Sequence, residues 1–322
     1  MKRLTPKTLS LLTTLLFLFG IISEEAIAQV AHRVTVATSG GDYTTITAAL
    51  AAITPSATDP YVIDVMPGTY VESLITMKNY VHLRGAGRQV TTIQAPSTTD
   101  PVIMTPAGQN NITVSGLAIK NGRFAISVST STSIVVRDND LRSNSYDIYI
   151  NDGGSVEITG NIISGTGHGV YIASGSATIT GNVIAGHTGG TGIVSNNALS
   201  SLNISNNIIS QNLFGISILG VASTINNNII TGNRFAGLEI QDSDTIIGNT
   251  ITGNGGVSGY AGIRLLSGSP ILSNNRITNN TPKDIEFDGG TPNVSFNVYD
   301  TLGGFSGTPP GSFNVKSNGT SW

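Results

Sequence analysis

The chain of 322 residues contains no cysteine, a single tryptophan and only 11% charged residues. Without cysteine it can form no disulfide framework, no thiolate nucleophile and no zinc or iron–sulfur site built on thiolates. The formal net charge is −3 and the 16 Lys and Arg residues form no basic run. We therefore expect no nucleic-acid partner, because phosphate binding requires a positive patch. Any chemistry must rest on carboxylates, His, Arg or Tyr.

Low charge does not indicate disorder here. Hydrophobic residues make up 39% of the chain, which is too many for a disordered, self-repelling sequence. The polar surface must therefore be uncharged, and the sequence supplies it with Ser, Thr, 39 Gly and 29 Asn.

The N-terminus carries the only long apolar run. Lys2, Arg3 and Lys7 precede this run at residues 9–22, and Ala26-Ile27-Ala28 follows it as a small-x-small pattern. This pattern predicts a signal peptide over 1–28 and a secreted, periplasmic or cell-surface mature chain of residues 29–322. A membrane anchor is the alternative, but the run is shorter than the roughly 20 residues that span a bilayer. We expect no membrane span after signal removal.

An internal repeat dominates the rest of the chain. The pattern aliphatic-x-x-Asn-x-hydrophobic recurs at intervals of 21 to 26 residues. Its asparagines are Asn139, Asn161, Asn182, Asn207, Asn228, Asn249, Asn275 and Asn297. A second aliphatic position recurs once in each repeat, for example at Ile126, Ile148 and Val170. The residue two positions after it is apolar in seven of the eight repeats. This alternation is typical of strands.

A repeat of about 22 residues with short strands is too short for paired helices. The pattern resembles the right-handed parallel β-helix of the pectin-lyase-like superfamily, which implies an all-β solenoid whose three-stranded rungs stack about 4.8 Å apart. The repeated asparagine would form a ladder of amide hydrogen bonds along the stack. We expect regular rungs over 112–299 and a C-terminal cap or tail over 300–322, within one domain.

The N-terminal third carries an amphipathic stripe. Ile46, Ala49, Leu50 and Ile53 have helical spacing, and Pro55 follows. The sequence therefore predicts a capping helix over 43–53 that covers the open end of the stacked core.

Residues 34–121 are similar to pectin methylesterases, through Gly41-Asp-Tyr-Thr-Thr-Ile46 and Pro67-Gly-Thr-Tyr-Val-Glu72. The catalytic glutamine of that family would fall on Phe124, its acid/base aspartate on Tyr146 and its nucleophile on Gly169. No Lys or Arg lies between Arg142 and Arg234 to supply its arginine. We therefore expect no esterase activity.

Gly167-His168-Gly169 is similar to the Gly-His-Gly motif of polygalacturonases. The paired aspartates of that family would fall on Ser145 and Tyr146, so inverting hydrolysis lacks its two carboxyl groups. His168 is more simply a turn residue, and it is kept as a weak catalytic candidate.

Carboxylates are absent from residues 158–238. The remaining catalytic candidates are Asp138, Asp140 and Asp147, with Arg137 or Arg142 nearby as the base that calcium-dependent lyases of this fold require. Calcium is expected only under that alternative, and otherwise no cofactor or metal. β-helix proteins of nitrous-oxide-reductase maturation suggest copper handling as another function. The four Met and four His of this chain, however, are scattered without the spacing of a set of copper ligands.

Tyr149 and Tyr171 follow successive second anchors, so alternation turns both outward one rung apart. They are the candidate carbohydrate-binding residues, with Asp147 and His168 at the adjoining turns for hydroxyl contacts; the alternative is a purely structural aromatic stack. The sequence thus favours a non-enzymatic exported binding or structural protein, with a polysaccharide or cell-envelope glycan as partner. A divergent polysaccharide lyase or glycoside hydrolase is the alternative, and the oligomeric state is open.

Overall fold

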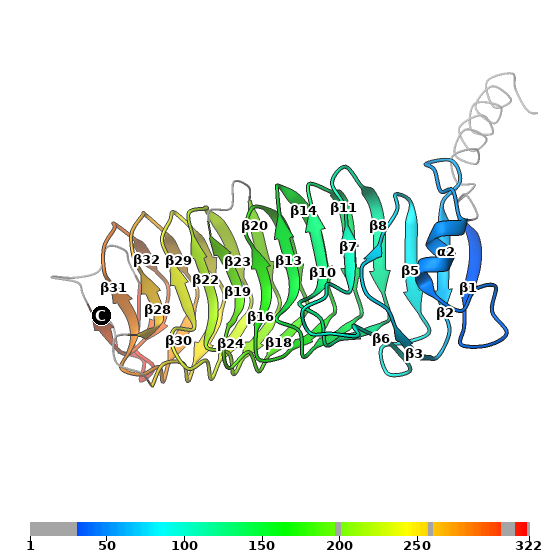
Figure 1. Cartoon of the computed structure of the whole chain (residues 1–322). Coiled ribbons are helices and arrows are strands. Elements are labelled where there is room, and N and C mark those ends of the chain that lie inside the picture. The colour runs from blue at the N-terminus through cyan, green and yellow to red at the C-terminus, as the bar shows by residue number, and fades with distance from the viewer. Residues whose placement is uncertain (1–30, 197–200, 257–259, 304–312, 321–322) are drawn as a thin grey trace, which may run out of the picture.

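The computed structural model describes residues 31–196, 201–256, 260–303 and 313–320. These residues wind into an elongated parallel β-solenoid of about 11 turns, with the first and the last described strands at opposite ends of the stack (Figure 1). Every strand pairing within the sheets is parallel, for example Val156 with Ala177 between adjacent rungs. The all-β solenoid with rungs of about 22 residues is therefore confirmed. Among the described residues, no helix is long and apolar enough to cross a membrane.

Three sheets run the length of the molecule. The first sheet contains β1 (His32–Val36), β2 (Tyr61–Val65), β5 (Val81–Gly85), β8 (Asn110–Ser115), β11 (Thr132–Arg137), β14 (Gly154–Thr159), β17 (Gly175–Thr180), β20 (Leu202–Ser205), β23 (Ser223–Asn226), β26 (Thr245–Ile247), β29 (Ile271–Ser273) and β32 (Asn293–Ser295). The second sheet contains β4 (Ile75–Thr76), β7 (Ile103–Thr105), β10 (Phe124–Ser129), β13 (Tyr146–Asn151), β16 (His168–Ile172), β19 (Thr191–Asn196), β22 (Phe214–Leu219), β25 (Leu238–Ile240), β28 (Ala261–Leu265), β31 (Lys283–Phe287) and β34 (Leu302–Gly303). The third sheet contains β3 (Gly68–Val71), β6 (Thr91–Gln94), β9 (Ala118–Lys120), β12 (Asp140–Arg142), β15 (Ile162–Ser164), β18 (Val183–Ala185), β21 (Ile208–Ser210), β24 (Ile229–Thr231), β27 (Thr250–Thr252), β30 (Arg276–Thr278) and β33 (Val298–Tyr299).

One short helix, α2 (Ile46–Ala52), covers the N-terminal end of the stack (Figure 1). It is shorter than the expected 43–53, because Thr45 is its N-cap and Ile53 is already extended. The side chain of Glu72 accepts hydrogen bonds from the backbone N–H groups of Ile46 and Thr47. Glu72 thereby accepts hydrogen bonds from two N–H groups that the first turn of a helix leaves unpaired. Its negative charge also interacts favourably with the positive end of the helix dipole.

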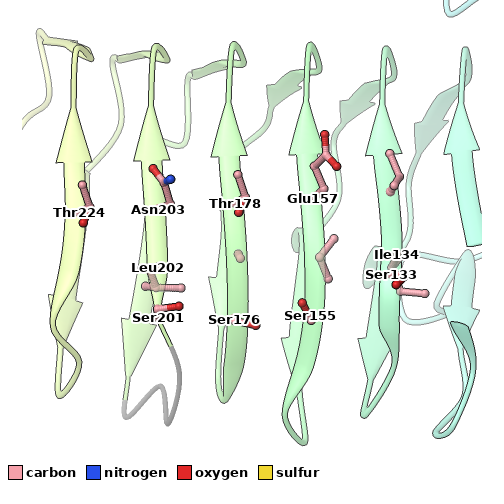
Figure 2. Close-up of a pocket in the computed structure, with 13 residues that line it drawn as sticks. Ser133, Ile134, Ser155, Glu157, Ser176, Thr178, Ser201, Leu202, Asn203 and Thr224 are labelled. Carbon is pink, nitrogen blue, oxygen red and sulfur yellow. The ribbon is translucent and has the colours of Figure 1, made fainter. Parts of the chain in front are cut away.

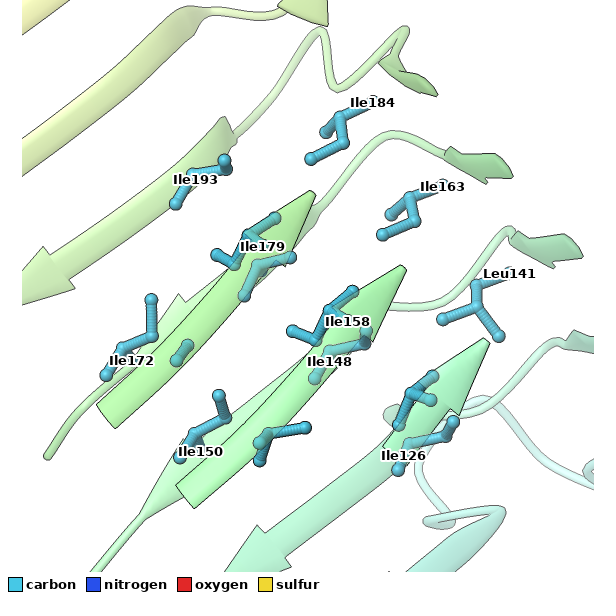
Figure 3. Close-up of a cluster of buried hydrophobic side chains, with 14 of the residues drawn as sticks. Ile126, Leu141, Ile148, Ile150, Ile158, Ile163, Ile172, Ile179, Ile184 and Ile193 are labelled. Carbon is cyan, nitrogen blue, oxygen red and sulfur yellow. The ribbon is translucent and has the colours of Figure 1, made fainter. Parts of the chain in front are cut away.

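The core is a set of aliphatic columns. Figure 3 shows isoleucines of all three sheets pointing into one interior, among them Ile148, Ile158 and Ile163. These side chains are fully buried. Each buried isoleucine contributes about 1.5–3 kcal/mol relative to an exposed one. Since each side chain packs on the equivalent one in the next rung, the apolar columns fix the register of the stack.

The eight asparagines of the repeat form a ladder and are at most 1% exposed. Asn207 represents the pattern: its backbone N–H and its Nδ2 both donate to Oδ1 of Asn228, at 2.9 and 3.0 Å. Its Nδ2 also donates to the carbonyl of Ile179 at 2.8 Å. In every rung the amide donates toward the C-terminal neighbour, so the ladder has one direction, and Asn314 accepts the last of these bonds.

The residue before each of these asparagines adopts a left-handed conformation that turns the chain. These residues are Asp138, Gly160, Gly181, Asn206, Asn227, Gly248, Asn274 and Phe296. All but the last are Gly, Asn or Asp, the types that tolerate positive φ best. The turn chemistry thus accounts for much of the Gly and Asn content.

Candidate functional site

A second ladder runs five residues after the first. Its asparagines are Asn144, Asn212, Asn233, Asn254 and Asn280, all buried. Asn212 repeats the geometry of the first ladder, because its backbone N–H and Nδ2 donate to Oδ1 of Asn233 at 3.0 and 3.1 Å. Two positions of the series lack an asparagine. Thr166 is exposed to solvent, and His187 occupies the position where the next asparagine is expected.

Asp147 and His187 bridge this break. Asn144 Nδ2 donates to Asp147 Oδ1 at 2.8 Å, and Asp147 Oδ2 lies 2.9 Å from His187 Nε2. On its other side, His187 Nδ1 lies 2.8 Å from Asn212 Oδ1. Both side chains of the pair are 0% exposed. The pair therefore replaces the ladder residue that Thr166 does not provide.

The ladder fixes the protonation of this pair. Asn212 Nδ2 donates to Ile184 and Asn233, so Asn212 Oδ1 is an acceptor and His187 Nδ1 must carry a hydrogen. One further hydrogen is then shared between His187 Nε2 and Asp147 Oδ2, and the pair is neutral whichever atom holds it. Burial raises the pKa of Asp147 to about 6, while the hydrogen bond to His187 acts in the opposite direction.

This burial corrects the expectation that Asp147 reaches a ligand or acts as an accessible catalytic acid. The equivalent position in later rungs is glycine: a Cβ at Gly192 would lie 2.9 Å from Nδ2 of Asn212. Asp147 has room only because Thr166 leaves the ladder position of the next rung empty. Asp284 has the same role at the end of the ladder, where its carboxylate accepts from the backbone N–H and Nδ2 of Asn280.

Five rings gather on the outer face of the second sheet beside this buried pair, and we call them the first aromatic cluster. They are Phe124, Tyr146, Tyr149, His168 and Tyr171. Tyr149 and Tyr171 pair in register on adjacent strands and stack at 5.5 Å, as the alternation predicts. Tyr146 and His168 pair in the same way and stack at 5.4 Å. All five rings are partly exposed.

His168 is the first residue of β16 rather than a turn residue. Its Nδ1 accepts a hydrogen bond from the backbone N–H of Thr191 at 3.2 Å, so the neutral ring carries its hydrogen on Nε2. Burial lowers the pKa of His168, which favours the neutral ring at neutral pH. Burial also raises the pKa of Tyr149, so its hydroxyl stays protonated. The cluster thus offers uncharged polar groups among ring edges.

A pocket of about 350 Å³ adjoins the cluster at Tyr146 and His168. The rest of its lining includes the hydroxyl residues Ser143, Ser145 and Thr166, together with Gly122 and Gly167. Aromatic surface next to a few fixed polar groups is the usual composition of a small-ligand site.

A larger, shallow groove of about 720 Å³ crosses five strands of the first sheet (Figure 2). Its outward side chains are mostly small and polar, such as Ser155, Ser176, Thr178 and Asn203, and Glu157 carries its one formal charge. No aromatic ring lines it. The aromatic cluster is therefore the stronger candidate site.

The other acidic candidates lie elsewhere. Asp138 occupies an exposed left-handed turn and pairs with Arg137 at 3.1 Å. Asp140 lies on the third sheet and pairs with Arg142 at 3.3 Å. The three aspartates thus occupy a turn, a different sheet and the buried ladder, and they share no site with the aromatic cluster.

No group of three His, Cys, Asp or Glu side chains that could hold a metal ion occurs in the part of the chain that the structure describes. Both ring nitrogens of His187 are engaged in the ladder, and His82 Nε2 lies 2.7 Å from Ser115 Oγ. Met77 is 1% exposed and packs in the core. Copper prefers imidazole, thiolate and thioether ligands. Of the copper-ligand types that the chain has, His187 is thus enclosed in the ladder and Met77 in the core.

Solved structures show the same fold at low identity. The A-module of the mannuronan C-5 epimerase AlgE4 of Azotobacter vinelandii has a TM-score of 0.63 and 18% identity, over 83% of this chain and 94% of that one. DFA-IIIase of Arthrobacter chlorophenolicus A6 in complex with GF2 has a TM-score of 0.57 and 12% identity, over 78% and 87%. ORF18 of Geobacillus virus E2 has a TM-score of 0.59 and 14% identity; 91% of this chain matches 64% of that one. At these identities the likeness concerns the fold alone.

No curated protein sequence matches the chain. Two family models do. The right-handed β-helix region matches residues 214–304, and the model described as periplasmic copper-binding protein (NosD) matches residues 65–236, more than half of the chain. The match covers the rungs that carry the first aromatic cluster and the Asp147–His187 pair. The chain belongs to the family of periplasmic copper-binding proteins (NosD).

Proposed function

We propose that this chain is an exported, non-enzymatic β-helix that binds carbohydrate at the first aromatic cluster, in the periplasm or outside the cell. The observation that carries the proposal is the gathering of five partly exposed rings beside a hydroxyl-lined pocket. Aromatic rings provide apolar contact for the C–H groups of a sugar, while nearby hydroxyl groups pair with its polar groups. The description of the family as periplasmic and the signal-like residues 1–28 support the location.

Two uncharged hydrogen-bond donors on the rings support carbohydrate as the ligand of the cluster. Tyr171 Oη accepts from Asn196 Nδ2 at 3.2 Å, so the tyrosine hydroxyl retains a hydrogen to donate to a sugar oxygen. Nε2 of His168 is a second donor on the adjacent column. These donors on a rigid sheet are held in place before a ligand arrives.

Binding without catalysis is favoured because the candidate carboxylates do not converge on the cluster. A hydrolase needs a carboxylic acid and a second carboxylate across the same bond. Asp147, the one acid next to the rings, is buried and engaged by Asn144 and His187. Two neighbours of this fold carry names of carbohydrate-active enzymes, so activity on polysaccharide is the outcome that would replace this proposal.

Copper enters the proposal only through the family description. Since the described residues contain no group of three His, Cys, Asp or Glu side chains that could hold a metal ion, we propose that carbohydrate rather than copper is the ligand of this β-helix. Titration of the purified protein with Cu(I) and Cu(II) checks this point, and tight stoichiometric binding would contradict it.

The double substitution Tyr149→Ser and Tyr171→Ser tests the carbohydrate site. Loss of retention on polysaccharide columns with a nearly normal melting temperature supports binding. A lower melting temperature with unchanged retention would show that the rings only stabilise the strands, a contribution of about 0.5–1.5 kcal/mol per aromatic pair. The matched control is Val183→Ser and Ile208→Ser, which removes two exposed apolar side chains from the third sheet.

The same polysaccharide panel, with and without calcium, is assayed for unsaturated products and new reducing ends. Release of either from any polysaccharide would overturn the non-enzymatic proposal.

A further inference from the structure

A second group of rings lies on the same edge of the second sheet, and we call it the second aromatic cluster. It consists of Phe214, Phe235 and Tyr260. Phe214 and Phe235 lie 5.0 Å apart, and Phe235 stacks on Tyr260 at 4.6 Å. All three rings are partly exposed. This cluster belongs to the rungs that follow the first one.

Three rings of the first cluster and the rings of the second cluster follow one another in one row along the sheet, while Tyr149 and Tyr171 lie in the next column. Phe124, Tyr146 and His168 pair in register on β10, β13 and β16. The backbone N–H of Thr191 on β19 donates to His168, and Thr191 in turn pairs in register with Phe214 on β22. Phe235 and Tyr260 precede the next two strands of the sheet. Seven consecutive rungs therefore carry six rings, with only Thr191 between the clusters, and at one rung every 4.7–4.9 Å the row spans roughly 29 Å.

Two arginines give the row its charge. The guanidinium of Arg123 lies 4.8 Å from the ring centre of Phe124, and that of Arg234 lies 5.7 Å from the ring centre of Phe235. Both arginines are exposed, and within the described residues neither makes an ion pair with a carboxylate. Arg264 also lies over a ring of the row, but it forms ion pairs with both Glu239 and Asp288, so these three groups together carry one net negative charge.

Negative charge is absent along most of the row. No Asp or Glu occurs from residue 158 to residue 238. Asp147 lies beneath the row, but the hydrogen that it shares with His187 keeps the pair neutral. Asp152 follows the far end of β13, at the opposite end of that strand from Tyr146. The middle of the row is therefore an uncharged aromatic surface. Arg123 lies at one end, where its backbone N–H donates to the carbonyl oxygen of Asp100, and Arg234 lies near the other end, next to the rung that carries Arg264.

We infer that this row is a single binding strip for a linear acidic polysaccharide, which lies along the solenoid axis and places carboxylate groups at Arg123 and Arg234. The inference rests on the proposed carbohydrate function and adds the charge and the length of the ligand. A linear chain fits because the rings follow one another from rung to rung rather than surround a closed pocket. An acidic chain fits because, within the described residues, neither Arg123 nor Arg234 forms an ion pair with a carboxylate, and both can form charge-assisted hydrogen bonds with the carboxylates of a ligand.

Affinity should then depend on ligand length. A polysaccharide that reaches both clusters binds the second one intramolecularly, so the entropy of association is lost only once and the overall affinity rises. A short oligosaccharide occupies one cluster only. The second cluster should therefore matter for long chains and not for short ones.

The test uses isothermal titration of the mature protein with oligogalacturonates of increasing length. For long oligomers we expect Arg234→Gln to weaken binding by about tenfold, while short oligomers that bind at the first cluster are unaffected. The double variant Phe214→Ser and Phe235→Ser should act in the same way. The matched control is Arg276→Gln, an exposed arginine on the third sheet, which should leave every affinity unchanged.

A second comparison tests charge alone. Carboxymethyl cellulose should bind more tightly than hydroxyethyl cellulose, which has the same backbone without carboxylates, and the difference should shrink as salt is added. If the protein binds both polymers equally and Arg234→Gln has no effect, while Tyr149→Ser with Tyr171→Ser still abolishes binding, the strip is wrong and the proposed function stands. Failure to bind any acidic or neutral polysaccharide would overturn both.

Discussion

Nε2 of His187 lies 2.9 Å from Oδ2 of Asp147, a residue 40 positions earlier in the chain, inside an otherwise amide-based ladder. The neighbouring amides donate toward the C-terminus, as Asn212 does to Asn233. If Asp147 holds the shared hydrogen, the pair continues this direction without a break. If His187 holds it, the direction reverses at one bond between two buried charges, which costs desolvation free energy. The direction of the neighbouring amide bonds thus favours the arrangement in which Asp147 Oδ2 donates to His187 Nε2.

The first prediction concerns this shared hydrogen. Asp147→Asn should change the free energy of unfolding at pH 5, below the pKa of about 6, by less than about 1 kcal/mol, because an amide accepts from Asn144 and donates to His187 as the neutral acid does. Asp147→Ala should cost about 2–4 kcal/mol, because it leaves two buried polar groups unpaired at about 1–3 kcal/mol each. Denaturant unfolding measures both. Equal losses for the two variants would mean that the pair needs the charged carboxylate.

The first ladder provides the second prediction. Asn207→Ala should lower the free energy of unfolding by about 1–3 kcal/mol, since Asn182 on one side and Asn228 on the other lose a buried partner. Asn196→Ala, at an exposed asparagine with one hydrogen bond to Tyr171, should cost much less. Thermal melts of the two variants compare them directly, and similar losses would argue against the ladder as a source of stability.

Asp244 gives the third prediction, which concerns pH. Its side chain is buried, Oδ1 accepts from the backbone N–H and the hydroxyl of Ser223, and burial raises the pKa of the carboxyl group to about 6. The folded state therefore binds this proton more tightly than the unfolded state does. The contribution favours folding below the unfolded pKa of about 3.9 and is lost as the pH rises through about 6.

We expect wild-type protein to lose about 1–3 kcal/mol of unfolding free energy relative to Asp244→Asn between pH 4 and pH 7.5. Denaturant titrations of both proteins at the two pH values measure the difference. A constant difference at the two pH values would mean that the carboxyl group does not titrate in this window.

The fourth prediction concerns the close approach of the second sheet to the second ladder. A Cβ at Gly215 would lie 2.4 Å from the carbonyl oxygen of Gly237 and 2.9 Å from Nδ2 of Asn233. Gly215→Ala should therefore destabilise the fold by about 1–3 kcal/mol through overpacking. Gly232 has open space but positive φ, so Gly232→Ala should cost only about 1–2 kcal/mol. Melting temperatures rank the two, and the reverse order would contradict the close packing.

The first ladder, the three-stranded rungs and the outward pairing of Tyr149 with Tyr171 were all predictable, because each depends on a residue type repeated at a fixed phase. The second ladder follows the first by a constant five residues, which is a usable signal. It is hard to recognise because Thr166 and His187 interrupt the asparagines. The contact between Asp147 and His187 depends on the outward turn of Thr166, which no pattern in the chain indicates.

The aromatic row was only partly predictable. Alternation from the inward Ile126 assigns Phe124 to the interior, but Phe124 stacks with the outward Tyr149 at 4.8 Å. The strand turns at Ala125, which is itself buried, so the period of two fails there. Tyr146 and His168 follow the same rule on the next two rungs. This change of side-chain direction within the strand depends on packing against the second ladder. The alternation of residue types along the sequence therefore cannot predict it.

The five-residue interval between the two ladders has an evolutionary consequence. From the second ladder to the first inward residue of the second sheet, the interval varies from four residues (Asn144 to Ile148) to nine (Asn254 to Ile263). Extra residues thus occur between the second ladder and the second sheet, next to the aromatic rings. The five-residue interval between the two ladders contains none. Successive generations can remodel the ligand surface, by adding loops or exchanging rings at that corner, while the amide columns that hold the rungs together remain untouched.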